Sequence, residues 1–539
     1  MKKQYFFRRR LATRSQMLQV VASIICLVML QTNKVEAQYT TCNFYSNNIK
    51  TRLHSDGNLF WDRMGHAQFE VPVGSGINSI FAGSLWCGGI NSATGELHLA
   101  GEKYRQVGSD FIQGEINVPS PPARSLWQIM NITINYHRLH YNDTNYNMDP
   151  DIANWNGAFE DLNNNGIYEP LLGEYPKIMG DDAVYFIYND SIPHTETGGL
   201  PLGVEIRAMV YAYYTTNSST EIDQALKNTI FIHYNIINKS ENNYRDFYIT
   251  SFTDPDLGNP TDDYIGFDTV LNMFYAYNGN NVDASTNGHI GYGDKVPAQG
   301  IMLLNRDASS FMCFHNAPNT GSPIIDPYTA QEHYNYMQAK WRDGTHLCYG
   351  GNGHQSGGGD VNNPVNFIFT GDPVTANGWT EINESIAPGD RRGIMSVYIG
   401  DFNAGENVCL DIAYPFAQPN VASGNLVPIT LLRERAAIIK DFYNQNNYDC
   451  EVYSNISVNN VLTKENCISL YPNPTTNILY IKTDLTIEQI SIYDIYGRLQ
   501  KQINDKQNTI SFENLANGIY NIKIKTSNGE IVTKKVVKM

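Results

Sequence analysis

Runs of aromatic and β-branched residues, separated by Gly, Asn, Asp and Pro, recur through most of the chain. Clear examples are AVYFIY at 183–188, AMVYAYY at 208–214 and NTIFIHYNIIN at 228–238. Runs of this length between turn residues are typical of β-strands. The pattern predicts an all-β chain. Its largest part, residues 38–455, is expected to be a β-rich, sandwich-like body of one or two subdomains with a few helices.

Two segments of the body predict helices instead. Thr329 followed by Glu332 forms a capping box ahead of HYNYMQAKW. The run that begins at Pro428 places Leu432 and Ile439 on one helical face. We expect these helices to cover sheet edges or to close a subdomain.

Histidines and tryptophans of the body are candidates for a site, but the pattern favours structural roles. INYHRLHYND (134–143) is interpreted as a strand, which would place His137 and His140 on opposite faces and separate them as metal ligands. His194 and Glu196, in PHTETGG, are interpreted as surface loop residues. Five tryptophans near Gly, Asn or Asp are expected to pack in the core rather than stack on sugars; they are Trp61, Trp86, Trp155, Trp341 and Trp379.

The first 37 residues have the pattern of a secretory signal peptide. Lys and Arg cluster before residue 15, LQVVASIICLVML follows at 18–30, and the small residue Ala37 precedes Gln38. The apolar run is short for a membrane span. We expect residues 1–37 to be removed and the mature chain to have no transmembrane segment.

Residues 467–539 alternate apolar and polar positions, with turns at Asn473-Pro474, Asn517-Gly518 and Asn528-Gly529. Several short strands at this spacing predict a small Ig-like antiparallel β-sandwich. We expect a linker at 456–466 to separate it from the body.

Four motifs in this tail resemble the type A C-terminal sorting domain of Bacteroidetes type IX secretion cargo. They are YPNP at 471–474, IYDIYGR at 492–498, LANGIY at 515–520 and KKVVKM at 534–539. The resemblance implies export through the inner membrane by the signal peptide. It also implies recognition of residues 467–539 by the type IX machinery at the outer membrane, followed by release or attachment at the cell surface.

The body also looks like a recurrent body of such sorting-domain proteins. The resemblance is carried by segments such as DLNNNGIYEPLLGEYPKIMGDDA and APGDRRGIMS, and it covers most of residues 55–445. It implies one family unit, and it supplies no activity and no catalytic residues.

Charge is distributed unevenly along the chain. The total is -16 at pH 7, from 38 Lys and Arg against 54 Asp and Glu. Residues 1–37 carry an excess of six basic residues and the tail an excess of three, which leaves -25 on residues 38–466. Phosphate binding needs clustered Lys and Arg, so this composition argues against a nucleic-acid partner and favours cation binding.

The first candidate cation site has oxygen-bearing side chains at alternate positions. They are Asp161, Asn163, Asn165 and Glu169, with Gly166 in the turn. The bidentate Glu of an EF-hand is missing, because Leu172 stands at position twelve. Two interpretations remain open: a calcium loop of another type, and a turn held by Asx hydrogen bonds.

The second candidate site is the segment DPDLGNPTDDYIGFD, whose oxygen-bearing residues are Asp254, Asp256, Asn259, Asp262, Asp263 and Asp268. So many carboxylates would repel one another unless they are solvated, hydrogen-bonded or neutralised by a hard cation. Calcium is the favoured interpretation.

Seven cysteines remain after residue 37, at wide spacings that predict disulfides rather than zinc binding in an exported protein; they are Cys42, Cys87, Cys313, Cys348, Cys409, Cys450 and Cys467. Their odd number leaves at least one thiol unpaired in a monomer, and Cys467 is a candidate for it.

No HExxH, GxSxG or Walker motif occurs in the chain. We therefore expect an exported, calcium-stabilised body with a binding, adhesive or structural role toward an extracellular glycan or protein. The alternative is an extracellular, glycan-directed hydrolase that uses paired carboxylates, for example Asp181 with Asp182 or Glu205 with Asp254.

Overall fold

The computed structural model describes residues 39–446 and 469–539, apart from short stretches at 105–107, 117–124, 215–219, 287, 317–320, 484–485, 495–497, 505–507 and 527–530. By its internal contacts the chain separates into two compact units, Met1–Ile456 and Ser457–Met539. The expected signal peptide and linker lie outside the described residues. Both units consist mainly of antiparallel strands, which confirms the all-β prediction.

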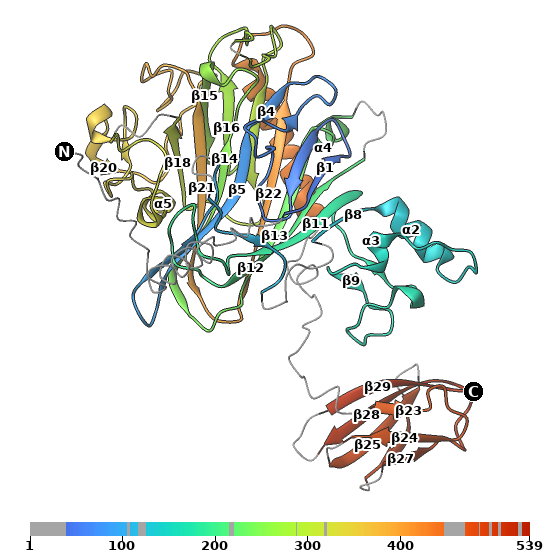
Figure 1. The fold of residues 1–539 in the computed structure, drawn as a ribbon. Coiled ribbons are helices and arrows are strands. Elements are labelled where there is room, and N and C mark those ends of the chain that lie inside the picture. The colour runs from blue at the N-terminus through green and yellow to red at the C-terminus, as the bar shows by residue number, and fades with distance from the viewer. Residues whose placement is uncertain are drawn as a thin grey trace, which may run out of the picture. The chain divides into compact units, whose positions relative to one another are not determined.

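The larger sheet of the body has nine strands (Figure 1). In spatial order they are β15 (Asp263–Asp268), β16 (Met273–Asn278), β17 (Ala298–Leu303), β22 (Asn407–Ala417), β13 (Thr229–Asn238), β12 (Val204–Ala212), β11 (Asp182–Asn189) and β7 (Ile112–Gln113), with β8 (Leu126–Met130) also paired to β11. The three strand-like runs singled out in the sequence are β11, β12 and β13, which are neighbours in this sheet.

A second sheet has five strands, and the N-terminal strands form a third. The five-stranded order is β18 (Ser310–His315), β21 (Arg391–Phe402), β14 (Tyr244–Asp254), β5 (Ala82–Asn91) and β6 (Leu97–Ala100). The four-stranded order is β1 (Thr41–Tyr45), β2 (Lys50–His54), β3 (Phe69–Glu70) and β4 (Asn78–Ile80). Two short pairs complete the body: β9 (Phe159–Glu160) with β10 (Tyr175–Pro176), and β19 (Cys348–Tyr349) with β20 (Asp360–Pro364).

The nine-stranded sheet is buried on both faces, which explains why its strands are nearly continuous apolar runs. Successive side chains of a strand point to opposite faces. Accordingly, Phe186 of β11 belongs to a core that also contains Ile249 of β14, in the five-stranded sheet. Its neighbour Tyr185 belongs to a second core, which contains Leu432.

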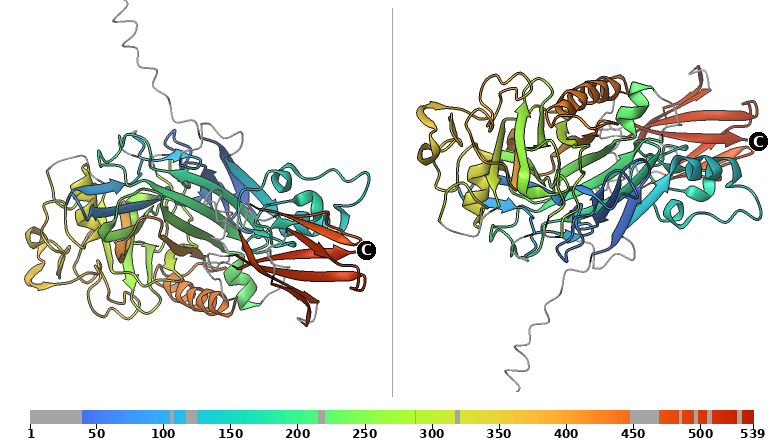
Figure 2. Two further views of the ribbon diagram at one scale, coloured as in Figure 1. Left: turned by 90° about the horizontal axis from the view of Figure 1, so that it is seen from below. Right: turned by 90° about the horizontal axis from the view of Figure 1, so that it is seen from above.

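The helices are α2 (Asn131–His140), α3 (Pro150–Ala153), α4 (Glu221–Leu226), α5 (Ala330–Met337) and α6 (Val427–Asn446), with 3₁₀ turns η1 (Pro170–Leu172), η2 (Pro260–Asp262) and η3 (Gln355–Gly357). Helices α2, α3, α4 and α6 cover part of the second core, whereas α5 packs in the first core. α6, the long orange helix in Figure 2, packs on β17 and β22. The two predicted helices are confirmed as α5, with both hydrogen bonds of its capping box, and α6.

α2 corrects the interpretation of residues 134–143 as a strand. Ile132, Ile134 and Tyr136 alternate as they would in a strand, but only Ile134 and His137 of this helix are buried. A spacing of three places these two side chains on one helical face. His137 is fully buried, and its Nε2 lies 3.0 Å from the Glu174 carbonyl oxygen, so its role is structural, as expected.

The tail is a small β-sandwich with its own core. One sheet contains β23 (Ser469–Tyr471), β24 (Ile478–Lys482) and β27 (Thr509–Ser511); the other contains β26 (Leu499–Ile503), β25 (Ile487–Asp494), β28 (Gly518–Thr526) and β29 (Ile531–Lys538). The YPNP motif lies against the final strand, because Asn473 Oδ1 accepts a hydrogen bond from the Val537 amide at 2.9 Å. Within the described parts of the chain, no helix has both the length and the apolar character needed to span a bilayer.

Four of the cysteines predicted to form disulfides are free thiols: Cys42, Cys87, Cys313 and Cys348. Cys87 and Cys313 lie on strands of the five-stranded sheet and are buried in the core, where they pack as small apolar side chains. Burial raises the pKa of both thiols above the ordinary value. Cys450 and Cys467 lie outside the described residues, so a disulfide involving them or Cys409 stays a prediction.

Candidate metal centre

Three carboxylates meet where β14 ends and β21 begins. Asp254 is the last residue of β14, Asp256 follows two residues later, and Asp390 immediately precedes β21. The two strands are antiparallel neighbours, with Thr253 opposite Gly393, so the end of one strand lies beside the start of the other. One carboxylate oxygen from each aspartate lies within 4.8 Å of the other two. We call Asp254, Asp256 and Asp390 the Asp cluster.

Among the described residues, one arginine, Arg392, pairs with this cluster. Arg392 Nη2 lies 3.2 Å from Asp254 Oδ2, and its Nη1 lies 2.6 Å from Asp390 Oδ1. Tyr104 donates its hydroxyl hydrogen to Asp254 Oδ2 and accepts a hydrogen bond from Arg392 Nε at 2.9 Å. Three carboxylates therefore share one guanidinium, and the ionised cluster keeps two uncompensated negative charges.

The nearby histidine does not supply the missing charge. His315 of β18 is paired with Arg391 across the sheet. Burial, together with the positive charges of Arg391 and Arg392, lowers the pKa of His315 to about 4. His315 is therefore neutral at physiological pH.

The cluster is buried, and two of its oxygens lack partners. Asp254 is 1% exposed and Asp256 is 8% exposed. Among the residues that the structure describes, Asp254 Oδ1 and Asp256 Oδ1 accept no hydrogen bond. Burial raises the pKa of both carboxyl groups, and the neighbouring carboxylates raise the pKa of Asp256 further. A buried acceptor without a partner is costly, so these oxygens call for a proton or a cation.

The spacing suits a hard cation. Calcium binds six to eight oxygens at about 2.3–2.6 Å, so two oxygens on one ion are at most about 5 Å apart. The carboxylate oxygens of the Asp cluster meet this limit. A divalent ion would also cancel the two excess charges.

The other predicted ligands of this segment have different partners. Asn259 Oδ1 accepts from the Thr261 amide at 3.3 Å, and Asp262 Oδ2 accepts from Asn280 Nδ2 at 2.9 Å. Asp263 Oδ2 accepts from the Leu257 amide, and Asp268 pairs with Arg433 Nε at 2.9 Å; these residues are not in the three-carboxylate group.

The first predicted loop is held by its own hydrogen bonds. Asp161 Oδ2 accepts from the Gly166 amide at 2.7 Å, and its Oδ1 accepts from the Asn165 amide at 3.1 Å. The side-chain amides of Asn163 and Asn165 both donate to Glu169 Oε2, at 2.8 and 2.6 Å. Two further bonds have the form of Asx turns, from the Asn165 amide to Asn163 Oδ1 at 3.0 Å and from the Ile167 amide to Asn165 Oδ1 at 2.7 Å. Calcium binding by this loop stays a prediction.

Asp390, Arg392 and Tyr104 were missed as site residues by the sequence reasoning. Asp390 and Arg392 belong to the DRR triplet at the start of β21, which the sequence presents as three consecutive charges at the start of a strand. The available signal was a charged triplet that leads directly into an apolar strand, because charged residues are seldom fully buried unless they are paired.

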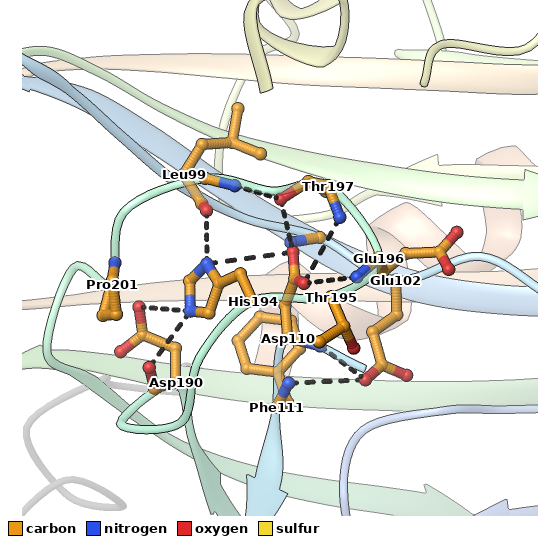
Figure 3. A network of polar contacts seen from close by, with 12 residues as sticks. Leu99, Glu102, Asp110, Phe111, Asp190, His194, Thr195, Glu196, Thr197 and Pro201 are labelled. Carbon is orange, nitrogen blue, oxygen red and sulfur yellow. Dashed lines mark hydrogen bonds and ion pairs between the residues drawn. The ribbon is translucent and has the colours of Figure 1, made fainter. Parts of the chain in front are cut away.

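His194 and Glu196 form a second buried network, which corrects their interpretation as surface residues. They are 8% and 1% exposed. Figure 3 shows the ring of His194 between two carbonyl oxygens: Nδ1 lies 2.7 Å from Leu99 O and Nε2 lies 3.1 Å from Asp190 O. The Glu196 amide donates to Asp110 Oδ1 at 2.9 Å. The network joins the loop before β12 to the segment after β6, which is a structural task.

The carboxylate pairs suggested for a hydrolase are not arranged as open acid pairs. Glu205 lies on β12 of the nine-stranded sheet and binds Arg207 Nε at 2.8 Å, whereas Asp254 lies on β14 of the other sheet. Asp181 accepts from the Tyr214 amide at 2.9 Å. Four of the five singled-out tryptophans are buried, which confirms their packing role: Trp86, Trp155, Trp341 and Trp379.

Comparisons with known proteins identify the tail. Residues 469–539 match the family described as "Secretion system C-terminal sorting domain". No curated protein matches the chain. A solved structure described as a polysaccharide lyase aligns at 7% identity over 66% of this chain and 39% of its own length, with a TM-score of 0.19, a likeness too low to inform the fold or the function of the body. The matched tail makes the chain a type IX secretion cargo, recognised by that machinery and exported to the cell surface or the medium.

Proposed function

We propose that the exported body is a calcium-stabilised β-module with a binding, adhesive or structural role. The observation that carries the proposal is the Asp cluster, in which buried carboxylate oxygens lack partners and one arginine faces three negative charges. Calcium is abundant outside cells, and a site assembled from two strands would tie the end of β14 to the start of β21.

Burial supports a structural ion over catalysis at the Asp cluster. Asp254 and Asp256 together expose too little surface for a sugar to reach both carboxylates. A glycosidase needs two accessible carboxyl groups about 5–10 Å apart on either side of the substrate bond. The glycan-directed hydrolase therefore remains the alternative without a supporting observation at this cluster.

Thermal unfolding of the full-length chain in calcium and in chelator tests the proposal. Calcium at a hundred times its dissociation constant would add about 2.7 kcal/mol to the free energy of unfolding. We expect calcium to raise the melting temperature of the wild type and of Asp401→Asn, an exposed carboxylate on the same strand β21. Asp390→Asn should lose most of the increase. Equal increases in all three proteins, or none in the wild type, would refute the proposal.

A further inference from the structure

A second, separate site is a pocket of about 370 Å³ between the loop after β17, strand β21 and helix α6. Its lining residues are Leu304, Asn305, Arg306, Asp307, Val397, Tyr398 and Lys440. The exposed lining is almost entirely polar, because Leu304 and Val397 are buried beneath it, whereas Tyr398 is 49% exposed at the rim. Tyr398 and Arg392, which pairs with the Asp cluster, lie at different positions along β21, so the pocket and the cluster have separate linings.

Two cations of the pocket are fixed by backbone carbonyl groups. Arg306 donates through Nε to the Cys409 carbonyl oxygen at 2.7 Å, and Lys440 donates through Nζ to the Leu304 carbonyl oxygen at 2.5 Å. Each bond uses one donor. Within the part of the chain that the structure describes, the two Nη groups of Arg306 and two hydrogens of Lys440 make no further hydrogen bond. The cations are thereby oriented before any ligand arrives.

These cations lack the counter-charge that most cations of the body have. In the described part of the chain, neither Arg306 nor Lys440 has a carboxylate within ion-pair distance. Burial lowers the pKa of both groups, and only Asp411 (on Arg306) and Asp307 (on Lys440) oppose this effect. The lining keeps a net positive charge, although residues 38–466 carry a large negative charge.

We propose that this pocket binds an anionic sugar, with the carboxylate or sulfate group between Arg306 and Lys440. The guanidinium fork suits the two oxygens of such a group, and Lys440 adds a point charge. The exposed ring of Tyr398 is oriented by its hydroxyl, which donates to Asp246 Oδ1 at 3.3 Å, and it offers an apolar face to the sugar ring. Asp307 supplies acceptors for sugar hydroxyl groups, whereas the side chain of Asn305 is held by the Asp411 amide and the Cys409 carbonyl group.

The size of the pocket matches one or two sugar rings rather than a whole polymer, since small-molecule sites span about 300–1,000 Å³. The ligand is therefore an exposed anionic residue of a glycan, and the rest of the glycan would extend over the surface. This inference gives the binding role of the body a ligand class, but it does not depend on calcium at the Asp cluster.

Calorimetric titration of the full-length chain with three oligosaccharide probes tests the inference: trigalacturonate, a sulfated disaccharide and neutral galactotriose. We expect at least one of the two anionic probes to bind roughly tenfold or more tightly than galactotriose, because a charge-assisted hydrogen bond contributes more than a neutral one. The stronger of the two anionic probes distinguishes carboxylate from sulfate as the recognised group. Equal binding of all three probes, or no binding of either anionic probe, would overturn the inference.

Two variants, Lys440→Gln and Arg306→Lys, test whether the anionic probe binds in this pocket. Lys440→Gln should weaken the anionic probe roughly tenfold and leave galactotriose unchanged, and Arg306→Lys should weaken it by losing the fork while retaining the charge. Lys177→Gln is the matched control, because Lys177 is a partly exposed lysine paired with Glu160 elsewhere in the body. Unchanged affinity in Lys440→Gln, or an equal loss in Lys177→Gln, would contradict the assignment whether or not the protein binds calcium.

Discussion

Two acid-rich segments of the body look alike in sequence and differ in structure. In the loop at 161–169 the side-chain oxygens point at amides of the same loop, and most of the loop is exposed. In the Asp cluster the carboxylates come from two distant segments, they are largely buried, and two oxygens have no partner among the described residues. The polar groups of the loop are hydrogen-bonded within the loop, whereas two carboxylate oxygens of the Asp cluster have no such partner among the described residues.

The difference shows that the density of acidic residues is a weak guide to a cation site. Amides and water can satisfy many exposed oxygens at little cost. A buried carboxylate must instead be paired, protonated or bound to a metal. Burial together with missing partners is the feature that separates the two segments, and each variant below changes one side of this contrast.

The largest effect is expected for Asp254→Ala. The substitution removes the carboxylate that pairs with Arg392, which is itself 2% exposed. Removing one partner of a buried ion pair costs about 3–5 kcal/mol. Arg392 keeps Asp390 as a partner, but Tyr104 also loses the acceptor of its hydroxyl group, so we expect a loss near the lower end of this range. Urea unfolding of the variant should show a loss of this size. A loss below about 1 kcal/mol would mean that the pair is solvated as at a surface.

Asp256→Asn isolates the contribution of the cation. The amide keeps the shape of the side chain and removes one negative ligand, so the variant should lose most of the calcium-dependent gain of about 2.7 kcal/mol at saturating ion. In chelator the variant should be at least as stable as the wild type, because Asn removes the cost of a buried carboxyl group whose pKa is raised by burial and by the neighbouring carboxylates. A full calcium response in the variant would remove Asp256 from the site.

Asp182→Asn tests what burial alone costs a carboxyl group that lies outside the proposed cation site. Burial raises the pKa of Asp182 to about 6, while its polar neighbours Ser46, Tyr214 and the Ala183 amide act in the opposite direction. The folded state therefore holds the proton more tightly than the unfolded state. The stabilising contribution of the Asp182 carboxyl group is complete below about pH 4 and is lost as the pH rises through about 6.

Replacing Asp182 with Asn should remove this loss and raise the free energy of unfolding at pH 8 by about 1–2 kcal/mol, after allowance for solvent screening. Denaturation at pH 4 and at pH 8 measures the difference, and calcium should have the same effect as in the wild type. A variant as sensitive to pH as the wild type would show that Asp182 is ionised at little cost.

The smallest effect is expected in the exposed loop. Asp161→Ala removes the acceptor of two loop amides, which water can replace, so the free energy of unfolding should fall by about 1 kcal/mol or less. The calcium response should persist. A lost calcium response in this variant would instead place the ion in the loop, as an alternate-oxygen calcium loop predicts.

The sequence predicted the fold class, the tail and the helices with clear local signals. The capping box at Thr329 and the apolar face of α6 depend on neighbouring residues, so they can be identified without a structure. α2 was missed because Ile132, Ile134 and Tyr136 alternate like a strand, although Ile132 and Tyr136 are exposed in the helix. The conformation of this segment depends on the packing of His137 against Glu174, which is a long-range contact.

The candidate site was predicted only in part for the same reason. Asp254 and Asp256 are neighbours in the chain, and their proximity follows from the DPD segment. Asp390 and Arg392 reach them only through the register between β14 and β21, more than a hundred residues apart, which a single sequence does not encode locally. Burial, which distinguishes this cluster from the loop at 161–169, is likewise a property of the packed sheets.

The most direct test of the central claim is to measure, by equilibrium dialysis, how many calcium ions each chain binds. The wild type and the surface control Asp401→Asn should bind the same amount, and Asp390→Asn should bind one ion fewer. Equal binding by the wild type and Asp390→Asn would contradict a calcium ion at the Asp cluster.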